Sequence, residues 1–248
     1  MPEDRALEGV RLIVTGASRG LGRAIAIACA QHGATVGINF HQSEADAREV
    51  AGRLGRSGIL LPFDVADPAA VTIAFQAFAD RTGGVDALVN NAGIIRPSLL
   101  VSALDADIAA VIGTNLFGTI ACTRAAIPFM LRQRRGVILN LSSVAAARPS
   151  RGQTVYAATK GAIEAFTRAV AIEYGRKGIR CECICPGPVD TAMFAATKAL
   201  AGEGVLERTP WKRFVTPEEI AATAVRLLAG QAGATGAVHT VDGGAPAG

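Results

Sequence analysis

The sequence has no long apolar segment that could span a membrane, although half of its 248 residues are apolar. Its longest uncharged run, Ile108–Thr123, is interrupted by glycine, threonine and asparagine. It therefore falls short of the roughly 20 mainly apolar residues that a spanning helix needs. The first residues are Met-Pro-Glu-Asp-Arg, which contain no apolar core of a signal peptide. We therefore expect a globular, cytoplasmic protein with no membrane partner.

Charged and aromatic residues are also scarce, at 19% and 5% of the chain. The net charge of +4, from 25 basic and 21 acidic residues, is a weak signal for nucleic acid. The basic residues form no stripe interleaved with aromatic side chains, so we expect no nucleic-acid partner. The large apolar fraction excludes a disordered chain, because burial of so much apolar surface offsets the entropy lost on folding.

The chain has only five cysteines, an odd number that argues against a secreted disulfide framework. Cys181, Cys183 and Cys185 alternate, so a strand would place all three on one face. Neighbouring thiols would then lie about 6.6 Å apart, too far for one zinc ion bound at about 2.3 Å. No CxxC motif or nearby histidine completes a site. We predict small buried side chains here and no metal.

Apolar segments of strand length alternate with segments of helical periodicity along the whole chain. The expected strands are Val10–Thr15, Ala34–Phe40, Gly58–Phe63, Val85–Asn90, Gly136–Ser142, Ile179–Cys185 and Ala237–Val241. The expected helices are Leu21–His32, Ser43–Arg56, Pro68–Thr82, Leu104–Leu131, Thr154–Arg176 and Pro217–Leu228. This alternation predicts an α/β fold, a Rossmann-like doubly wound parallel sheet of about seven strands with helices on both faces.

No linker or repeat interrupts the pattern, so we expect residues 1–248 to form a single domain. The segment Met193–Phe214 has weak periodicity and follows the carboxyl end of a strand. Open α/β sheets bind ligands at that edge, so we expect a substrate lid around residues 191–214.

A glycine-rich turn follows the first expected strand and opens the first helix. Gly16, Gly20 and Gly22 allow a tight turn, close approach of the backbone to a pyrophosphate, and close packing of helix on strand. The helix N-terminus presents free N–H groups to the phosphates. Such turns also occur for packing reasons alone, but this position in an alternating pattern favours a dinucleotide site.

A pair of residues suited to proton transfer stands on one expected helix. Tyr156 and Lys160 are four residues apart and share a helix face. An ammonium group favours the phenolate, so we expect Lys160 to lower the pKa of Tyr156. Such a tyrosine can donate a proton to a carbonyl or accept one from an alcohol. A tyrosine and a lysine at this spacing are common on ordinary helices, so the pair is not decisive alone.

Five motifs follow one another along the chain: the GxxxGxG spacing of the glycines, Asn90–Gly93, Tyr156–Lys160, Pro186-Gly187 and Val241–Gly244. Together they resemble the short-chain dehydrogenase/reductase family across essentially the whole chain. The resemblance implies that the catalytic residues are Asn115, Ser143, Tyr156 and Lys160. The cofactor-binding residues that it implies are Gly16, Ser18, Arg19, Gly20, Leu21, Gly22, His41, Asp64, Val65, Asn91, Ala92, Gly93, Tyr156, Lys160, Pro186, Gly187, Val189 and Thr191.

The resemblance also implies a role for each catalytic residue. Ser143 would hold the substrate oxygen; Ser142 is its neighbour, but strand alternation points it to the other face. Lys160 would also bind the nicotinamide ribose, Asn115 would support a water-linked proton path, and Thr191 would meet the carboxamide. Asp64 and Val65 would contact the adenine.

The expected second strand lacks the acidic residue with which NAD enzymes bind the ribose 2′-hydroxyl. It ends in Asn39-Phe40-His41, and no carboxylate follows before Glu44. Arg19 stands in the glycine turn, where its guanidinium can pair with a 2′-phosphate. We predict NADP(H) as the cofactor, with a preference softened because NADPH enzymes of the family often carry Arg in place of His41.

Within the family, the pattern is most similar to 3-oxoacyl-[acyl-carrier-protein] reductases of fatty-acid or polyketide synthesis. Arg134 and Lys177 match the carrier-docking positions of that subfamily, although solvated basic residues at helix ends would look the same. The alternatives are a family enzyme that acts on a sugar, steroid, quinone or small ketone, and a non-catalytic NADP-binding protein. Family analogy implies a homotetramer. Glu182 departs from the family, which commonly has Asn there, and its partner cannot be predicted.

Overall fold

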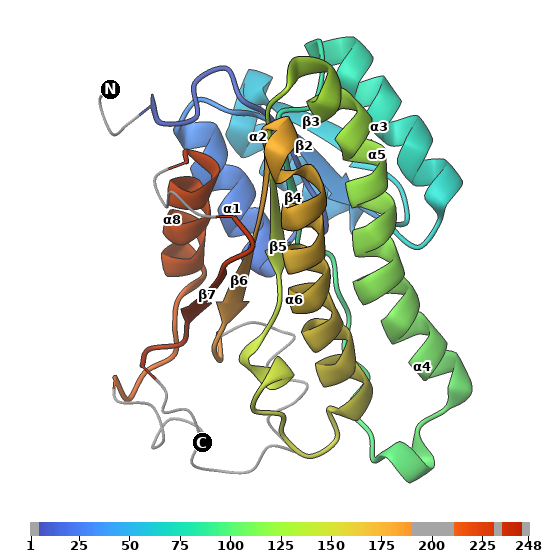
Figure 1. The fold of residues 1–248 in the computed structure, drawn as a ribbon. Helices are drawn as coiled ribbons and strands as arrows, with labels where there is room; N and C mark the ends of the chain where they lie inside the picture. Colours follow the sequence, from blue (N-terminus) through green and yellow to red (C-terminus); the bar gives the residue numbers. More distant parts are fainter. Residues whose placement is uncertain (1–4, 190–210, 231–234, 245–248) are drawn as a thin grey trace.

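The computed structural model describes residues 5–189, 211–230 and 235–244. In this part of the chain seven parallel strands form one sheet in the order β3-β2-β1-β4-β5-β6-β7 (Figure 1). The strands are β1 (Arg11–Val14), β2 (Thr35–Phe40), β3 (Gly58–Pro62), β4 (Ala87–Asn90), β5 (Gly136–Leu141), β6 (Ile179–Pro186) and β7 (Val238–Val241). The helices are α1 (Gly20–Gln31), α2 (Glu44–Leu54), α3 (Pro68–Thr82), α4 (Asp105–Ile112), α5 (Gly118–Gln133), α6 (Thr154–Tyr174) and α8 (Pro217–Leu228). Short helical turns are η2 (Gly55–Ser57), η3 (Leu100–Ser102), η4 (Gly113–Phe117), η5 (Val144–Ala146) and η6 (Gly175–Lys177).

Helices cover both faces of the sheet, as the sequence predicts. Leu12 and Val14 of β1 point into one apolar core, which is shared with α1, α2 and α8. Ile13, between them, points into the second core with α3, α5 and α6. Figure 1 shows α1, α2 and α8 on one side of the strands and α3, α5 and α6 on the other. The predicted doubly wound fold is confirmed.

Local side-chain chemistry determines where two of the helices begin. The carboxylate of Asp67 accepts hydrogen bonds from the N–H groups of Ala69 and Ala70, so α3 begins directly after it. Thr216 and Glu219 cap each other's backbone N–H groups at the start of α8. These side chains satisfy donors that the first turn of a helix leaves free.

The expected helix Leu104–Leu131 contains a turn of π-helix. It consists of α4, the π-turn η4 and α5, which ends at Gln133. Such turns are rare and occur mostly at functional sites. Here the π-turn contains the candidate residue Asn115.

By length and composition, the continuous helix Asp105–Gln133 could cross a membrane. This test is also passed by core helices of globular proteins. Its α5 part has buried residues such as Cys122, Ala126 and Met130, which pack into the second apolar core. The expectation that the protein has no membrane partner stays a prediction.

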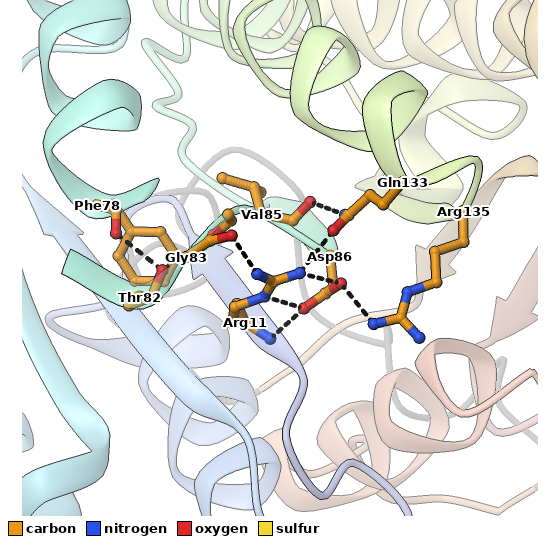
Figure 2. A network of polar contacts seen from close by, with 9 residues as sticks. Arg11, Phe78, Thr82, Gly83, Val85, Asp86, Gln133 and Arg135 are labelled. Carbon is orange, nitrogen blue, oxygen red and sulfur yellow. Dashed lines mark hydrogen bonds and ion pairs between the residues drawn. The ribbon is translucent and has the colours of Figure 1, made fainter. Parts of the chain in front are cut away.

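A polar network closes the amino ends of the central strands (Figure 2). The Arg11 guanidinium donates to Asp86 Oδ1 at 2.8 Å and to Gln133 Oε1 at 2.6 Å. Gln133 Nε2 donates to the carbonyl of Val85 at 2.7 Å, and Arg135 Nη2 lies 3.3 Å from Asp86 Oδ1. The side chains of Arg11 and Asp86 are only 19% and 10% exposed. The network therefore links β1, the start of β4, the end of α5 and the start of β5.

Burial raises the pKa of Asp86, but hydrogen bonds and charge from Arg11, with a smaller effect from Arg135, outweigh it. The net pKa of Asp86 lies below its ordinary value. The carboxylate is therefore more stable in the folded protein than in water.

Glu182 has two partners that the sequence could not reveal. Its fully buried carboxylate forms an ion pair with Arg180 and a hydrogen bond with Nε2 of His239 in β7, the latter at 2.7 Å. On the opposite face of β6, Cys181, Cys183 and Cys185 are buried free thiols. In the described parts of the chain, no group of three or more His, Cys, Asp or Glu side chains could hold a metal ion.

Candidate active site

Most of the candidate residues follow the carboxyl ends of parallel strands. Gly16 follows β1, Asn91 follows β4, Ser143 follows β5 and Gly187 follows β6. The carboxyl ends of parallel strands lie at one edge of a sheet, so the fold brings these residues to the lower edge in Figure 1.

The glycine turn has the geometry that a phosphate site needs. Gly16 and Gly20 have positive φ angles of 61° and 56°. A Cβ at Gly22 would lie 2.3 Å from the carbonyl oxygen of Gly16, so only glycine fits there. A Cβ at Gly20 would meet nothing within 4 Å, so that side of the turn is open. Since α1 begins at Gly20, its free N–H groups stand beside this open space.

Two polar residues that the sequence analysis did not select brace this turn. Asn39, at 2% exposure, accepts a hydrogen bond from the N–H of Gly16 at 3.0 Å and donates to Phe63 at 2.9 Å. The Thr15 hydroxyl oxygen accepts from the N–H groups of Asn91 and Ala92, both at 3.0 Å. The only sequence signal for either role is a polar residue near the carboxyl end of an apolar strand.

Asn91 supports the same turn from β4. Its side-chain amide donates to the carbonyl oxygens of Thr15 at 2.9 Å and Gly16 at 3.1 Å. A Cβ at the following glycine, Gly93, would lie 3.3 Å from Asn115 Oδ1. The segment from Asn91 to Gly93 therefore packs between the glycine turn and the π-turn.

The candidate 2′-phosphate region is exposed. Arg19 is exposed and forms no ion pair with the described residues. His41 is exposed too, and its Nδ1 lies 3.6 Å from a carboxylate oxygen of Asp64. Asp64 also accepts from the N–H of Ala66, and Val65 beside it is buried. Arg19 therefore lies at the start of α1, and the contact between His41 and Asp64 lies just after β2 and β3.

Ser143, Tyr156 and Lys160 come together between β5 and α6. The Ser143 side chain lies near that of Tyr156 and acts to lower its pKa. Lys160 is buried, its Nζ donates to the carbonyl of Leu141 at 2.7 Å, and it lies 5.6 Å from the centre of the Tyr156 ring. The expected shared face of Tyr156 and Lys160 is therefore present in the structure.

The expected effect of Lys160 on Tyr156 is wrong in this structure. Burial raises the pKa of Tyr156 to about 12, and the opposing effect of the hydrogen bond from Ser143 is smaller. Burial also lowers the pKa of Lys160 to about 8. Spacing alone predicted attraction between ammonium and phenolate, but the loss of solvent around both groups dominates. The Tyr156 phenol therefore keeps its proton at neutral pH, as a proton donor to a carbonyl must.

The two adjacent serines have different surroundings. Ser143 contacts Tyr156, and its Oγ accepts from the N–H of Ala145 at 3.2 Å. Ser142 is buried, and its hydroxyl lies 3.1 Å from the main-chain oxygen of Lys160. The side chain beside Tyr156 is thus that of Ser143.

Asn115 lies fully buried in the π-turn and joins two parts of the site. Its Oδ1 accepts from the N–H of Ile94 at 2.8 Å, and its Nδ2 donates to Ile94 O at 3.0 Å. The same amide lies 3.2 Å from the Thr159 hydroxyl, which donates to the carbonyl of Tyr156. Asn115 therefore connects the loop after β4 to the helix that carries Tyr156.

The far side of the edge is formed by β6 and β7. Pro186 ends β6, and the N–H of Gly187 donates to Val241 at 2.8 Å. A Cβ at Gly187 would lie 2.6 Å from Asp242 Cα, so glycine is required there. Val189 pairs with Val215 in an isolated bridge. Thr191 and the predicted lid up to residue 210 lie outside the described residues.

The candidate docking residues lie at the other edge of the sheet. Arg134 ends α5 and Lys177 is in η6, both exposed and just before β5 and β6. Their loops touch, because the N–H of Gly136 donates to Gly178 at 3.2 Å. The structure therefore brings Arg134 and Lys177 into neighbouring loops, but not to the edge that holds Tyr156.

Comparisons with known proteins agree with the fold and with an oxidoreductase. A family model described as enoyl-(acyl carrier protein) reductase matches residues 16–246. A 3-oxoacyl-[acyl-carrier-protein] reductase of Chlamydia muridarum is 40% identical over 236 residues, 94% of this chain and 95% of the relative. One from Synechocystis sp. is 38% identical over 245 residues, 96% of this chain and 98% of the relative.

A solved structure is also similar over nearly the whole chain. It is a gluconate 5-dehydrogenase from Burkholderia cenocepacia J2315 in complex with NADP and tartrate. It has a TM-score of 0.90 and 33% identity, and the match covers 97% of each chain. Together with the glycine turn and the Ser143, Tyr156 and Lys160 cluster, these similarities show that the chain belongs to the short-chain dehydrogenase/reductase family of oxidoreductases.

Proposed function

We propose that the protein is an NADPH-dependent ketoreductase that converts 3-oxoacyl-[acyl-carrier-protein] to the 3-hydroxyacyl form in fatty-acid or polyketide synthesis. The observation that carries the proposal is the cluster of Ser143, Tyr156 and buried Lys160, at the edge where the glycine turn opens. The substrate class is supported by the names of the relatives that are 38–40% identical to the chain over nearly its full length.

The proposed chemistry divides between cofactor and protein. Bound NADPH would supply the hydride for the carbonyl carbon. Tyr156 would donate its phenolic proton to the carbonyl oxygen, which fits a pKa raised by burial to about 12. Ser143 would hold that oxygen in place, and Lys160 would bind the ribose and pass a proton toward Tyr156. Asn115 would hold the groups of the proton path to solvent in position, since it joins the π-turn to α6.

The residues present fit a dinucleotide. The turn from Gly16 to Gly22 is open at Gly20 and leads into the N-terminus of α1. Ser18, Leu21, Asn91, Ala92 and Gly93 would complete the phosphate and ribose contacts, and Asp64 with Val65 would bind the adenine. We propose that Arg19, which forms no ion pair with the described residues, selects NADP(H) over NAD(H) together with the exposed His41 after β2. The solved relative that binds NADP agrees with this choice.

The test is a panel of NADPH-oxidation assays with acetoacetyl thioester, longer 3-oxoacyl carrier thioesters, simple ketones and 5-ketogluconate. The last substrate is included because the similar solved structure is named gluconate 5-dehydrogenase. We expect the highest kcat/KM with the carrier thioesters. Turnover of 5-ketogluconate or simple ketones alone would overturn the carrier proposal and favour another ketoreductase of the family. Absence of turnover with every ketone, despite NADPH binding, would favour a non-catalytic NADP-binding protein.

We propose that Arg134 and Lys177 dock the acidic carrier protein. We also propose that the protein is a cytoplasmic homotetramer, in which residues 1–248 of each subunit form a single domain. The two residues precede β5 and β6, whereas Ser143 follows the six residues of β5, about 20 Å further along. A carrier docked on one subunit would then deliver its thioester to the site of a neighbouring subunit. Charge reversal at both residues should raise KM for the carrier thioester and spare small ketones; an equal loss on both would refute docking.

A further inference from the structure

Glu164 is a half-buried carboxylate of α6 to which the proposed reaction gives no role. It follows Lys160 by four residues and Tyr156 by eight. Residues at this spacing share one helix face. Glu164 therefore lies on the face of α6 that presents the two candidate catalytic side chains to the sheet.

The contact of Glu164 is with the residue before Ser143. Glu164 Oε1 accepts a hydrogen bond from the Ser142 hydroxyl at 2.9 Å. The same hydroxyl lies 3.1 Å from the main-chain oxygen of Lys160. A serine hydroxyl has one proton, so the two acceptors share it, and the charged acceptor forms the stronger bond. Ser142 is only 4% exposed, so water does not replace either contact.

The bond to Glu164 is one of several that join the end of β5 to α6. Lys160 Nζ donates to the carbonyl of Leu141, and Ser143 lies near Tyr156, whose pKa it acts to lower. Residues 141–143 thus contact α6 at each of three successive turns. The contact made by Glu164 involves no group that would touch substrate or cofactor.

Glu164 lies near Lys160 and the thiols of β6, since Lys160 and Glu164 both act on the pKa of Cys183. In the described parts of the chain it forms no ion pair, and it acts on Cys183 and Cys185 of β6. Burial, with a smaller contribution from the charge of Glu164, raises the pKa of these thiols to about 12 and about 11. A partly buried carboxylate that forms no ion pair is costly in free energy unless hydrogen bonds stabilise it. The Ser142 hydroxyl provides that stabilisation.

We propose that Glu164 is a positioning residue, which through Ser142 holds Ser143 against Tyr156. This inference rests on the proposed ketoreductase function. It predicts that loss of Glu164 slows the chemical step and leaves cofactor binding at the glycine turn unchanged.

The activity test compares Glu164→Ala, Glu164→Gln, Ser142→Ala and the double variant Glu164→Ala/Ser142→Ala. Glu173→Ala is the matched control, since Glu173 is an exposed glutamate near the end of the same helix. We expect Glu164→Ala to lower kcat roughly 10- to 100-fold, because small misplacements of reacting groups have such effects. KM for NADPH should stay within about twofold, Glu164→Gln should recover most of the loss, and the control should match wild type.

The double variant decides whether Glu164 acts through Ser142. If it does, the double variant is no slower than Ser142→Ala alone. Multiplying effects would overturn the inference, as would a kcat of Glu164→Ala within twofold of wild type. A fall in thermal stability with unchanged kcat would show a structural role only and would overturn it as well.

Hydrogen–deuterium exchange separates this inference from the proposed function, because it needs no substrate. Glu164→Ala should speed exchange in the segment from Ser143 to Arg148, where Ala145 N–H is bonded to Ser143 Oγ. Glu173→Ala should not. If the wild-type protein reduces no ketone and this segment still loosens, the positioning stands and the function falls. Unchanged exchange in Glu164→Ala would overturn the positioning.

Discussion

The two edges of the sheet use polar residues in opposite ways. At the amino edge, Arg11, Asp86, Gln133 and Arg135 bond to one another over sequence separations of 49 to 122 residues (Figure 2). At the carboxyl edge, the exposed guanidinium of Arg19 has no ion-pair partner among the described residues. The amino edge therefore joins distant parts of the chain, whereas the carboxyl edge leaves at least this charged group open to solvent.

The same contrast appears in the shifts of pKa. Burial raises the pKa of Asp86, but Arg11 more than compensates, and the carboxylate is stabilised. Lys160 is buried and its Nζ forms no ion pair with the described residues, and burial lowers its pKa to about 8. A buried charge with a partner adds stability, whereas one without an anionic partner loses proton affinity and gains a pKa useful for proton transfer.

At the carboxyl edge, Gly22→Ala should strongly weaken cofactor binding. The new Cβ would lie 2.3 Å from Gly16 O and 2.4 Å from Asn91 Nδ2, so the phosphate turn must shift. We expect the Kd for NADPH to rise on the order of 100-fold or more, measured by fluorescence titration. Gly52→Ala in α2, where a Cβ meets nothing within 4 Å, is the control and should bind normally. Normal binding by Gly22→Ala would show that the turn does not hold the cofactor.

At the amino edge, Arg11→Ala should reduce the free energy of unfolding by about 3 kcal/mol, because it leaves the carboxylate of Asp86 poorly paired. Below its melting temperature the variant should keep wild-type kcat and KM. Chemical denaturation and the ketone assay measure the two effects. A variant with normal stability and reduced kcat would reverse the assignment of the two edges.

Acid should weaken the amino edge specifically. The pKa of Asp86 in the folded protein lies below the ordinary value of 3.8, so its carboxylate stabilises the protein above that pH. This contribution is lost as the pH falls through 3.8 and below. Asp86→Asn should therefore be less stable than wild type at pH 7 and lose less further stability on acidification. Parallel stability curves between pH 7 and pH 3 would contradict the predicted role of Asp86.

The smallest effect is expected at Arg19. Arg19→Ala should reduce the ratio of kcat/KM for NADPH over NADH roughly tenfold, through loss of a guanidinium–phosphate contact of about 1.4 kcal/mol. Arg56→Ala is a suitable control, since Arg56 is an exposed arginine in η2, after α2. An unchanged ratio in Arg19→Ala would mean that another residue selects the cofactor.

Much of the fold could be predicted because it depends on local pattern. Strand and helix positions agree with the apolar periodicity to within a few residues, and the glycine turn follows from its spacing. The partners Arg11 and Asp86 lie 75 residues apart, and Glu182 meets His239 across 57 residues, so no local pattern indicates either contact. The π-turn at Asn115 depends on contacts with Ile94 and Thr159, not on its own sequence.

For the candidate site, the sequence predicted which side chains lie close together better than it predicted their pKa values. The spacing of Tyr156 and Lys160 correctly places both side chains on one helix face. It cannot reveal how much solvent the rest of the fold removes, and this desolvation determines both pKa values. Asn39 and Thr15 were missed for the same reason, since their bracing role appears only when β2 and β4 stand beside the glycine turn.

The central claim is that the carboxyl edge performs ketone reduction with Tyr156 as the proton donor. The most direct test is kcat of Tyr156→Phe with acetoacetyl thioester at saturating NADPH, with NADPH affinity measured on the same sample. We predict a loss of roughly 10²- to 10⁴-fold in kcat with unchanged affinity and thermal stability. A kcat within a few-fold of wild type would contradict the account.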